Sequence, residues 1–264
     1  MTYCVAMLLD TGLVFLSDSR TNAGVDQIST FRKSTVFSKP GERVLVLQSS
    51  GNLAITQTVI SILKEEIDTG CSVGAAAAAT AHGTRPNLMT APNLFEAARC
   101  VGDALRELHR RDAGPLKDFG VDFNASLILG GQIKGEPPRL FSIYSAGNFI
   151  EATTDTTYFQ IGESKYGKPI IDRVLRRTSS LNEAVKCALV SMDSTIRSNL
   201  SVGLPLDLVI MKRDRFKVAR HISIDADNDY FRGIRGRWSE ALREAFVQLP
   251  EPDWLSSVAR DTAD

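Results

Sequence analysis

The chain has 264 residues, enough to bury a sizeable core in one large domain or two small ones. Its 31 basic residues balance 31 acidic ones, so there is no electrostatic reason to expect nucleic acid or an anionic membrane as a partner. No apolar run is long enough to span a bilayer, and no basic flank precedes the apolar N-terminal stretch. We therefore expect a cytoplasmic protein.

The first part of the chain is predicted to form β-strands. Apolar runs on either side of Asp10-Thr11-Gly12 indicate a β-hairpin, while the polar stretch 24–30 is typical of a loop. Lys39-Pro40-Gly41-Glu42 is a turn signal between two further apolar runs. The strands predicted here are Thr2–Leu9, Leu13–Ser17, Ser34–Ser38 and Arg43–Gln48.

Helical periodicity begins after this group. Apolar residues recur at helical spacing from Ile55 to Ile67, and Asn52 is placed as the N-cap. The alanine-rich stretch Gly74–Thr80 is interpreted as a short helix or connector. A second long helix is predicted over Asn93–Arg111, and Gly114-Pro115 is expected to end that segment.

The second half repeats the order of strands and then helices. Ser180 and Glu183 have the spacing of a capping box at the start of one of these helices. The predicted strands are Asn124–Gly130, Arg139–Tyr144 and Tyr158–Ile161; the helices are Lys168–Arg177 and Leu181–Arg197; the final hairpin is Leu206–Lys212 and Phe216–Ile224. Hairpin groups alternating with helix pairs predict antiparallel sheets covered by helices, an α+β domain.

The last forty residues differ in character. An acidic stretch at Asp225–Asp229 is followed by a concentration of aromatic side chains: Tyr230, Phe231, Trp238, Phe246 and Trp254. One interpretation is a terminal helix packed on its own domain. The other is an arm onto a neighbouring subunit, since aromatic residues anchor interfaces. We therefore divide the chain into a domain over residues 2–224 and an aromatic-rich extension over residues 225–264.

Neither cysteines nor histidines are spaced as a metal site or a histidine-based triad requires. The four cysteines are scattered without a C-x-x-C pair, which argues against zinc and against a secreted disulfide framework. Cys4 and Cys187 stand in apolar runs typical of buried positions. The histidines, expected in solvated or structural roles, are His82, His109 and His221. We expect no metal and no cofactor.

A threonine directly follows Met1, and the element order behind it resembles the N-terminal-nucleophile hydrolases, specifically the proteasome β-type subunits. The residues that carry the resemblance are Thr2, the SDSR at Ser17–Arg20, Lys33, and the SSGNLA at Ser49–Ala54. The stretch MTYCVA…DTGLVFLSDSRTNAG is most similar to the Anbu family of bacterial proteasome-type peptidases. The resemblance implies a four-layered αββα fold and self-association of identical subunits into a ring or spiral.

The implied catalytic residues are Thr2, Asp18 and Lys33. If Met1 is removed, the α-amino group of Thr2 can act as the base for its own hydroxyl, and no histidine is needed. Lys33 would favour the neutral amine, Asp18 would pair with Lys33 and aim it, and the backbone N–H of Gly51 would donate to the oxyanion. The cycle would run through an acyl-enzyme formed on the Thr2 hydroxyl.

Supporting residues match the family less closely. Gly162-Glu163-Ser164 stands where many members have Gly-Ser-Gly, so Glu163 or Ser164 is expected to replace a hydrogen-bonding serine. In the segment 198–201, Ser201 matches a family serine, while Ser198 or Asn199 takes the place of an aspartate. These departures affect how the amine is activated or which peptides are accepted.

Three other interpretations stay open. Asp10-Thr11-Gly12 resembles an aspartic-protease signature, but that chemistry needs two carboxylates and the chain has no second DTG. A catalytically silent, proteasome-like scaffold subunit would share the fold without the activity. A third possibility keeps the threonine nucleophile but cleaves a small amide or an isopeptide instead of protein. The sequence identifies no ATPase partner.

Overall fold

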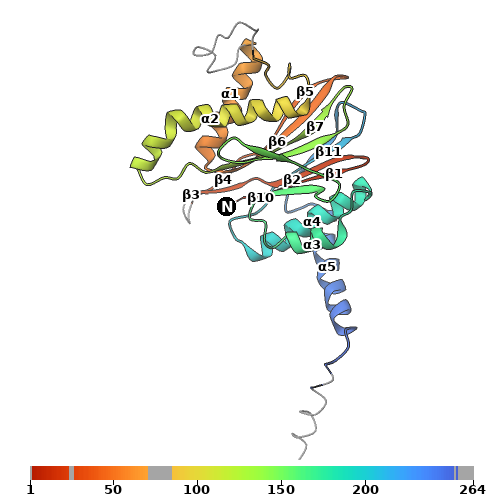
Figure 1. Cartoon of the computed structure of the whole chain (residues 1–264). Coiled ribbons are helices and arrows are strands. Elements are labelled where there is room, and N and C mark those ends of the chain that lie inside the picture. Colours follow the sequence, from red (N-terminus) through yellow and green to blue (C-terminus); the bar gives the residue numbers. More distant parts are fainter. Residues whose placement is uncertain (1, 24–26, 71–84, 253, 255–264) are drawn as a thin grey trace, which may run out of the picture. The chain divides into compact units, whose positions relative to one another are not determined.

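The computed structural model describes residues 2–23, 27–70, 85–252 and 254, so the predicted segment Gly74–Thr80 lies outside the described residues. The chain divides into two compact units, Met1–Ala226 and Asp227–Asp264. The described residues of the first unit form two antiparallel five-stranded sheets, a small two-stranded sheet and four helices (Figure 1).

The first sheet is built around the N-terminal hairpin. Leu9 pairs with Gly12, so Asp10 and Thr11 form the tight turn, as predicted. In sheet order the strands are β10 (Tyr158–Gly162), β1 (Tyr3–Leu9), β2 (Gly12–Asp18), β11 (Leu206–Lys212) and β12 (Val218–Ile224). The central strand β2 and its neighbour β1 are buried along their whole length.

The second sheet packs against the first. Its strands, in order, are β5 (Ser34–Lys39), β6 (Arg43–Gly51), β7 (Ala125–Ile133), β8 (Arg139–Ile143) and β9 (Phe149–Glu151). Side chains of both sheets share one apolar cluster, in which Ala6 and Phe15 of the first meet Val46 and Ile128 of the second. The three-residue strand β9 was not predicted, because so short a run carries no readable alternation.

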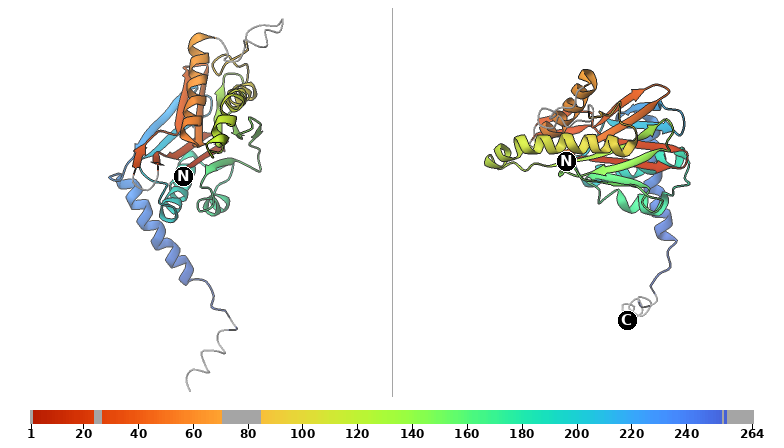
Figure 2. Two further views of the ribbon diagram at one scale, coloured as in Figure 1. Left: turned by 90° about the vertical axis from the view of Figure 1, so that its left-hand side faces the viewer. Right: turned by 45° about the horizontal axis from the view of Figure 1, so that its top comes forward.

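Helices cover the outer faces. In Figure 1 and in both views of Figure 2, α1 (Leu53–Thr69) and α2 (Leu94–Asp118) lie on one side of the sheets. Their apolar faces join the second sheet in a large core. On the other side, α3 (Lys168–Val174) packs on α4 (Leu181–Ser198), which packs on β1 and β2. The predicted α+β class, with antiparallel sheets and covering helices, is confirmed.

One predicted loop is wrong in part. Residues 27–30 form strand β4 (Gln27–Thr30), which pairs antiparallel with β3 (Arg20–Ala23) in a separate two-stranded sheet. This strand was not predicted because its sequence is polar and shows no alternating apolar face. Its register comes from backbone pairing with β3.

The predicted end of the second long helix is also wrong. Helix α2 continues through Pro115 to Asp118. A proline inside a helix removes one backbone donor and usually breaks the helix. Here the next residue, Leu116, packs against the core shared by α1, α2 and the second sheet. That burial explains why the helix continues for one further turn.

The second unit contains helix α5 (Asp229–Val247), whose first turn is capped by Asn228 through the Phe231 N–H at 2.9 Å. Several large apolar side chains of this unit are exposed: Tyr230, Leu242, Phe246, Val247, Leu249 and Trp254. Both interpretations of the tail, and the domain limits 2–224 and 225–264, stay predictions. Among the described helices, none combines the length and the apolar character needed to cross a bilayer.

Candidate active site around Thr2

Thr2 is held at the start of β1 by the end of β10. Its carbonyl oxygen accepts the N–H of Glu163 at 2.7 Å. Gly162, at φ +82°, comes so close that a Cβ there would lie 1.9 Å from the Thr2 oxygen. Only glycine allows this approach in the left-handed region, so Gly162 is required to fix the position of Thr2.

Lys33 and Asp18 form a buried ion pair behind Thr2. The Lys33 ammonium donates to Asp18 Oδ1 at 2.7 Å and to the Arg20 carbonyl at 2.6 Å. The same carboxylate oxygen accepts the Tyr3 N–H at 3.0 Å. Asp18 is fully buried and Lys33 is 5% exposed, so the pair is shielded from solvent. The β1 backbone next to Thr2 is therefore tied directly to this ion pair.

Opposing effects act on the Asp18 carboxyl. Burial raises its pKa, and the Lys33 ammonium together with the N–H groups of Tyr3 and Gly203 acts to lower it. Its second oxygen, Oδ2, is buried without a hydrogen-bond partner among the described residues. The ionised form of Asp18 is therefore stabilised mainly by Lys33.

Gly51 ends β6 and leads into α1. Its φ of +116°, and the 2.4 Å that would separate a Cβ from the Asn124 carbonyl, exclude other residues. The Asn52 side chain accepts the Ala54 N–H at 3.0 Å and caps α1, as predicted. The first turn of α1 contains no acidic residue, so its positive dipole end beside Gly51 is not neutralised locally.

Three of the four principal predicted site residues line one pocket of about 550 Å³: Thr2, Lys33 and Gly51. Asp18 does not line it and contacts Lys33 from behind. The complete lining is Thr2, Arg20, Thr21, Arg32, Lys33, Ser49, Ser50, Gly51, Asn52, Leu53, Thr56, Gln57, Ile60, Asn124 and Gly162. The pocket can therefore present a hydroxyl, a cation and a helix N-terminus to one bound group.

The supporting residues predicted with Thr2 are placed unevenly. Glu163 is buried, and its Oε2 accepts the Asn199 side-chain N–H at 3.0 Å. Asn199 in turn accepts the Ser201 N–H at 2.9 Å. Ser198 is exposed at the end of α4, and Ser164 is half-buried. None of the three predicted serines lines the pocket, and neither does Glu163. Asn199, not Ser198, is the residue that contacts the Glu163 carboxylate.

Sequence reasoning missed the pocket roles of Arg20 and Arg32. Arg20 was noted only as the end of the SDSR motif, and Arg32 precedes Lys33 without any pattern of its own. Both reach the pocket because β3 and the segment before β5 lie beside Thr2 in the fold. No local spacing in the sequence indicates this convergence.

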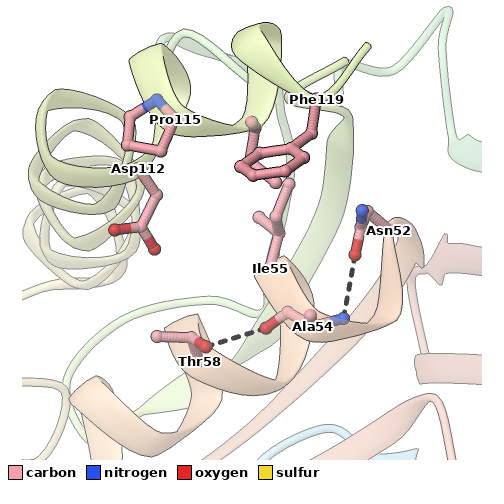
Figure 3. A pocket seen from close by; sticks show the side chains of 8 residues that line it. Asn52, Ala54, Ile55, Thr58, Asp112, Pro115 and Phe119 are labelled. Atoms are coloured by element: carbon pink, nitrogen blue, oxygen red, sulfur yellow. Dashed lines mark hydrogen bonds between the residues drawn. The ribbon is translucent and has the colours of Figure 1, made fainter. Parts of the chain in front are cut away.

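A second pocket, of about 350 Å³, lies between the first turns of α1 and the C-terminal part of α2 (Figure 3). Ile55 faces Phe119 across it, and Asp112 and Pro115 line its far side on α2. The lining contains neither Thr2 nor Lys33. Its walls are mainly apolar, in contrast to the cationic pocket around Thr2.

Asp10 and the described histidines lie outside the Thr2 pocket. The Asp10 side chain is 53% exposed at the hairpin turn and pairs with Arg177 at 3.1 Å. His221 contacts Asp207 at 2.6 Å, His109 packs edge-on against Phe123, and His82 lies outside the described residues. Within the described residues there is no cluster of three or more metal-ligating side chains.

Comparison with known proteins defines the family. No protein-family model matches the chain. A curated relative, the proteasome subunit beta of Haloquadratum walsbyi, is 22% identical over 208 residues, covering 78% of this chain and 84% of the relative.

Solved structures match more closely. An Anbu (Gly-1) mutant from Hyphomicrobium sp. strain MC1 is 52% identical with a TM-score of 0.85, covering 96% of this chain and all of that one. Anbu (ancestral beta-subunit) from Yersinia bercovieri is 53% identical with a TM-score of 0.83, at coverages of 95% and 98%. The helical assembly of the Anbu complex from Pseudomonas aeruginosa gives 48% and 0.83, also at 95% and 98%.

The fold and these relatives place the chain among the proteasome-type N-terminal-nucleophile hydrolases. Within that class it belongs to the Anbu family.

Proposed function

We propose that the protein is an N-terminal threonine peptidase or amidohydrolase with Thr2 as its nucleophile. One observation carries the proposal: Thr2, Lys33 and Gly51 line a single pocket, and Asp18 holds Lys33 from behind. The packing of two sheets between two helix pairs also supports the four-layered αββα arrangement of this hydrolase class.

The chemistry starts once Met1 is removed. A free α-amino group has an ordinary pKa of about 7.7–8.0, so it can accept a proton near neutral pH, whereas the amide present with Met1 attached cannot. Lys33 favours the neutral amine and stabilises negative charge that develops on the Thr2 oxygen.

Two covalent steps follow. Thr2 Oγ bonds to the substrate carbonyl carbon while its proton passes to the amine, and the Gly51 N–H with the α1 terminus stabilises the oxyanion. The C–N bond then breaks, and the amine proton leaves with the departing amine. Water attacks the resulting ester, the C–Oγ bond breaks, and the hydroxyl of Thr2 is restored.

Glu163, Asn199 and Ser201 are proposed to support the N-terminal residue. Glu163 connects to Thr2 through its backbone N–H and to Asn199 through its carboxylate. Within the described part of the chain, no side-chain hydrogen bond links Ser164 or Ser198 to this group, so we assign them no role in holding Thr2.

Self-association is part of the proposal. The solved Pseudomonas aeruginosa relative is described as a helical assembly of the Anbu complex, and this chain is 48% identical to it. We propose a homo-oligomer for this protein, to be tested by analytical ultracentrifugation of the purified chain.

The deciding experiment for the activity is intact mass before and after treatment with a peptide α,β-epoxyketone, which reacts with a hydroxyl and a free amine on one residue. Loss of one methionine and a single adduct, absent in Thr2→Ala, supports the proposal. Retained Met1 without an adduct favours the silent scaffold, and a processed terminus without an adduct favours a specialised small-amide or isopeptide substrate.

A further inference from the structure

The pocket around Thr2 is lined by cations. Its charged lining residues are Arg20, Arg32 and Lys33, and no Asp or Glu is among the described residues that line it. Lys33 keeps its charge but is paired with Asp18 at 2.7 Å. Among the described lining residues, the two arginines therefore carry the charge that has no acidic partner.

Arg20 is built into the wall. Its Nη1 donates to the Leu200 carbonyl at 3.1 Å, and its guanidinium lies so close to Gly203 that a Cβ there would be 2.3 Å from Arg20 Cζ. Its Nε is buried without a hydrogen-bond partner among the described residues. The Arg20 guanidinium is therefore fixed in the wall of the pocket that it lines, and it contributes a permanent positive charge there.

Arg32 stands at the exposed rim of the same pocket. Over the described part of the chain, neither Arg32 nor Arg20 takes part in an ion pair, although most other arginines on its surface do. A planar guanidinium matches a carboxylate in two parallel hydrogen bonds, and it stays charged at any pH of interest.

The N-terminus of helix α1 adds positive charge to the same pocket. Leu53, Thr56, Gln57 and Ile60 form one face of the helix in the pocket lining, and its uncompensated N-terminus is at Gly51 and Asn52. A group bound with its carbonyl at Gly51 and its carbonyl carbon at Thr2 would place the neighbouring substituent in this cationic space.

We propose that the pocket selects substrates whose acyl residue, the one that supplies the attacked carbonyl, carries a carboxylate side chain, as glutamate and aspartate do. This inference rests on the proposed function for the identity of the reacting bond. Arg32 and Arg20 are the specificity-determining residues, and the apolar Leu53 and Ile60 contact the methylene groups of the side chain.

The test uses three acetyl-Ala-Ala-X epoxyketones in which X is Glu, Gln or Lys, with the rate of adduct formation followed by intact mass. We expect Glu to react at least about 10-fold faster than its neutral isostere Gln, and Lys to react slowest. The Glu-to-Gln rate ratio should fall towards one in Arg32→Gln and in 0.5 M salt, and it should be partly retained in Arg32→Lys.

A matched control is Arg110→Gln, since Arg110 is an exposed arginine on α2 paired with Glu107, and this change should leave the ratio unaltered. Equal or faster reaction of the Gln reagent overturns the inference and leaves the peptidase proposal standing. Retained Met1 and absence of an adduct with all three reagents count against the proposed function instead.

Binding separates the two proposals completely. The Thr2→Ala variant lacks the nucleophile, so calorimetry with acetyl-Ala-Ala-Glu-amide and acetyl-Ala-Ala-Gln-amide measures the pocket without any chemistry. Tighter binding of the Glu peptide, lost in Thr2→Ala/Arg32→Gln, supports the charge selection. Equal affinity for the two peptides overturns it.

Discussion

The Lys33 ammonium and the Asp18 carboxylate lie 2.7 Å apart in a site that solvent scarcely reaches. Asp18 also accepts the backbone N–H of Tyr3, the residue next to Thr2. The pair consequently connects the fold's stability to the position of the candidate nucleophile. Its two roles can be separated by experiment.

Replacing Lys33 alone should destabilise the fold strongly. Lys33→Met leaves Asp18 buried and uncompensated, which typically costs about 3–5 kcal/mol in the free energy of unfolding. The double variant Lys33→Met/Asp18→Asn removes both charges and keeps an acceptor for the Tyr3 N–H, so most of the stability should return. Adduct formation should be absent in both variants. Denaturant titration with the epoxyketone assay measures the two effects, and a double variant as unstable as the single one would contradict this account.

The stability of the Lys33→Met variant should also depend on pH. Burial already raises the pKa of Asp18 above its ordinary 3.8, and removal of Lys33 removes the largest opposing effect. A carboxyl whose folded pKa exceeds its unfolded value stabilises the fold most below the unfolded value and loses that contribution as pH rises through the folded pKa. Lys33→Met should therefore be more stable at pH 5 than at pH 7.5. Lys33→Met/Asp18→Asn, which lacks the carboxyl, should show a weaker dependence between those two pH values.

A matched pair of glycines tests how Thr2 is positioned. Gly162 and Gly120 have similar φ values, +82° and +69°, but a Cβ at 162 would meet the Thr2 oxygen at 1.9 Å while one at 120 meets nothing within 4 Å. Gly120→Ala should cost about 1 kcal/mol from backbone strain alone. Gly162→Ala must also displace Thr2, so it should cost more and slow adduct formation by about 100-fold.

Thermal unfolding and the epoxyketone rate, measured on both alanine variants, decide the point. Equal effects of the two substitutions on the rate would mean that the close approach at Gly162 does not position Thr2.

Local signals were readable from the sequence. Asn52 caps α1, and Ser180 with Glu183 forms the predicted capping box of α4, because caps depend on residues only a few positions apart. The hairpin at Asp10 and Thr11 was predicted for the same reason. The motif residues Thr2, Asp18 and Lys33 were found by resemblance. The antiparallel pairing of β1 with β2 brings Asp18 to the Tyr3 N–H next to Thr2.

Long-range contacts were not readable. Helix α2 continues through Pro115 because Leu116 packs against the apolar core. The polar strand β4 forms because its backbone pairs with β3. The position of Arg20 in the pocket wall depends on residues far from it in the chain, since its guanidinium contacts Leu200 and Gly203. Such positions are set by the packed fold, and no periodicity or spacing reports them.

Glu163 gives the most informative prediction on activation of the amine. Its backbone N–H is 2.7 Å from the Thr2 carbonyl oxygen, and its buried carboxylate contacts the Asn199 side chain at 3.0 Å and the exposed Lys165 ammonium at 3.9 Å. A negative charge close to a free α-amine favours the protonated form of that amine. Glu163→Gln keeps the size of the side chain and an acceptor for Asn199 but removes the charge. The acid limb of the rate profile for adduct formation should therefore move to lower pH by on the order of one unit.

The control is Glu183→Gln, which removes a carboxylate from the exposed start of α4 and should leave the limb in place. Glu163→Asp should keep the limb close to its original pH, since it retains the charge. A limb that does not move in Glu163→Gln would limit Glu163 to holding Asn199 and the Thr2 carbonyl. In that case the departure from the family's serine at this position would affect the architecture of the site and not the basicity of its amine.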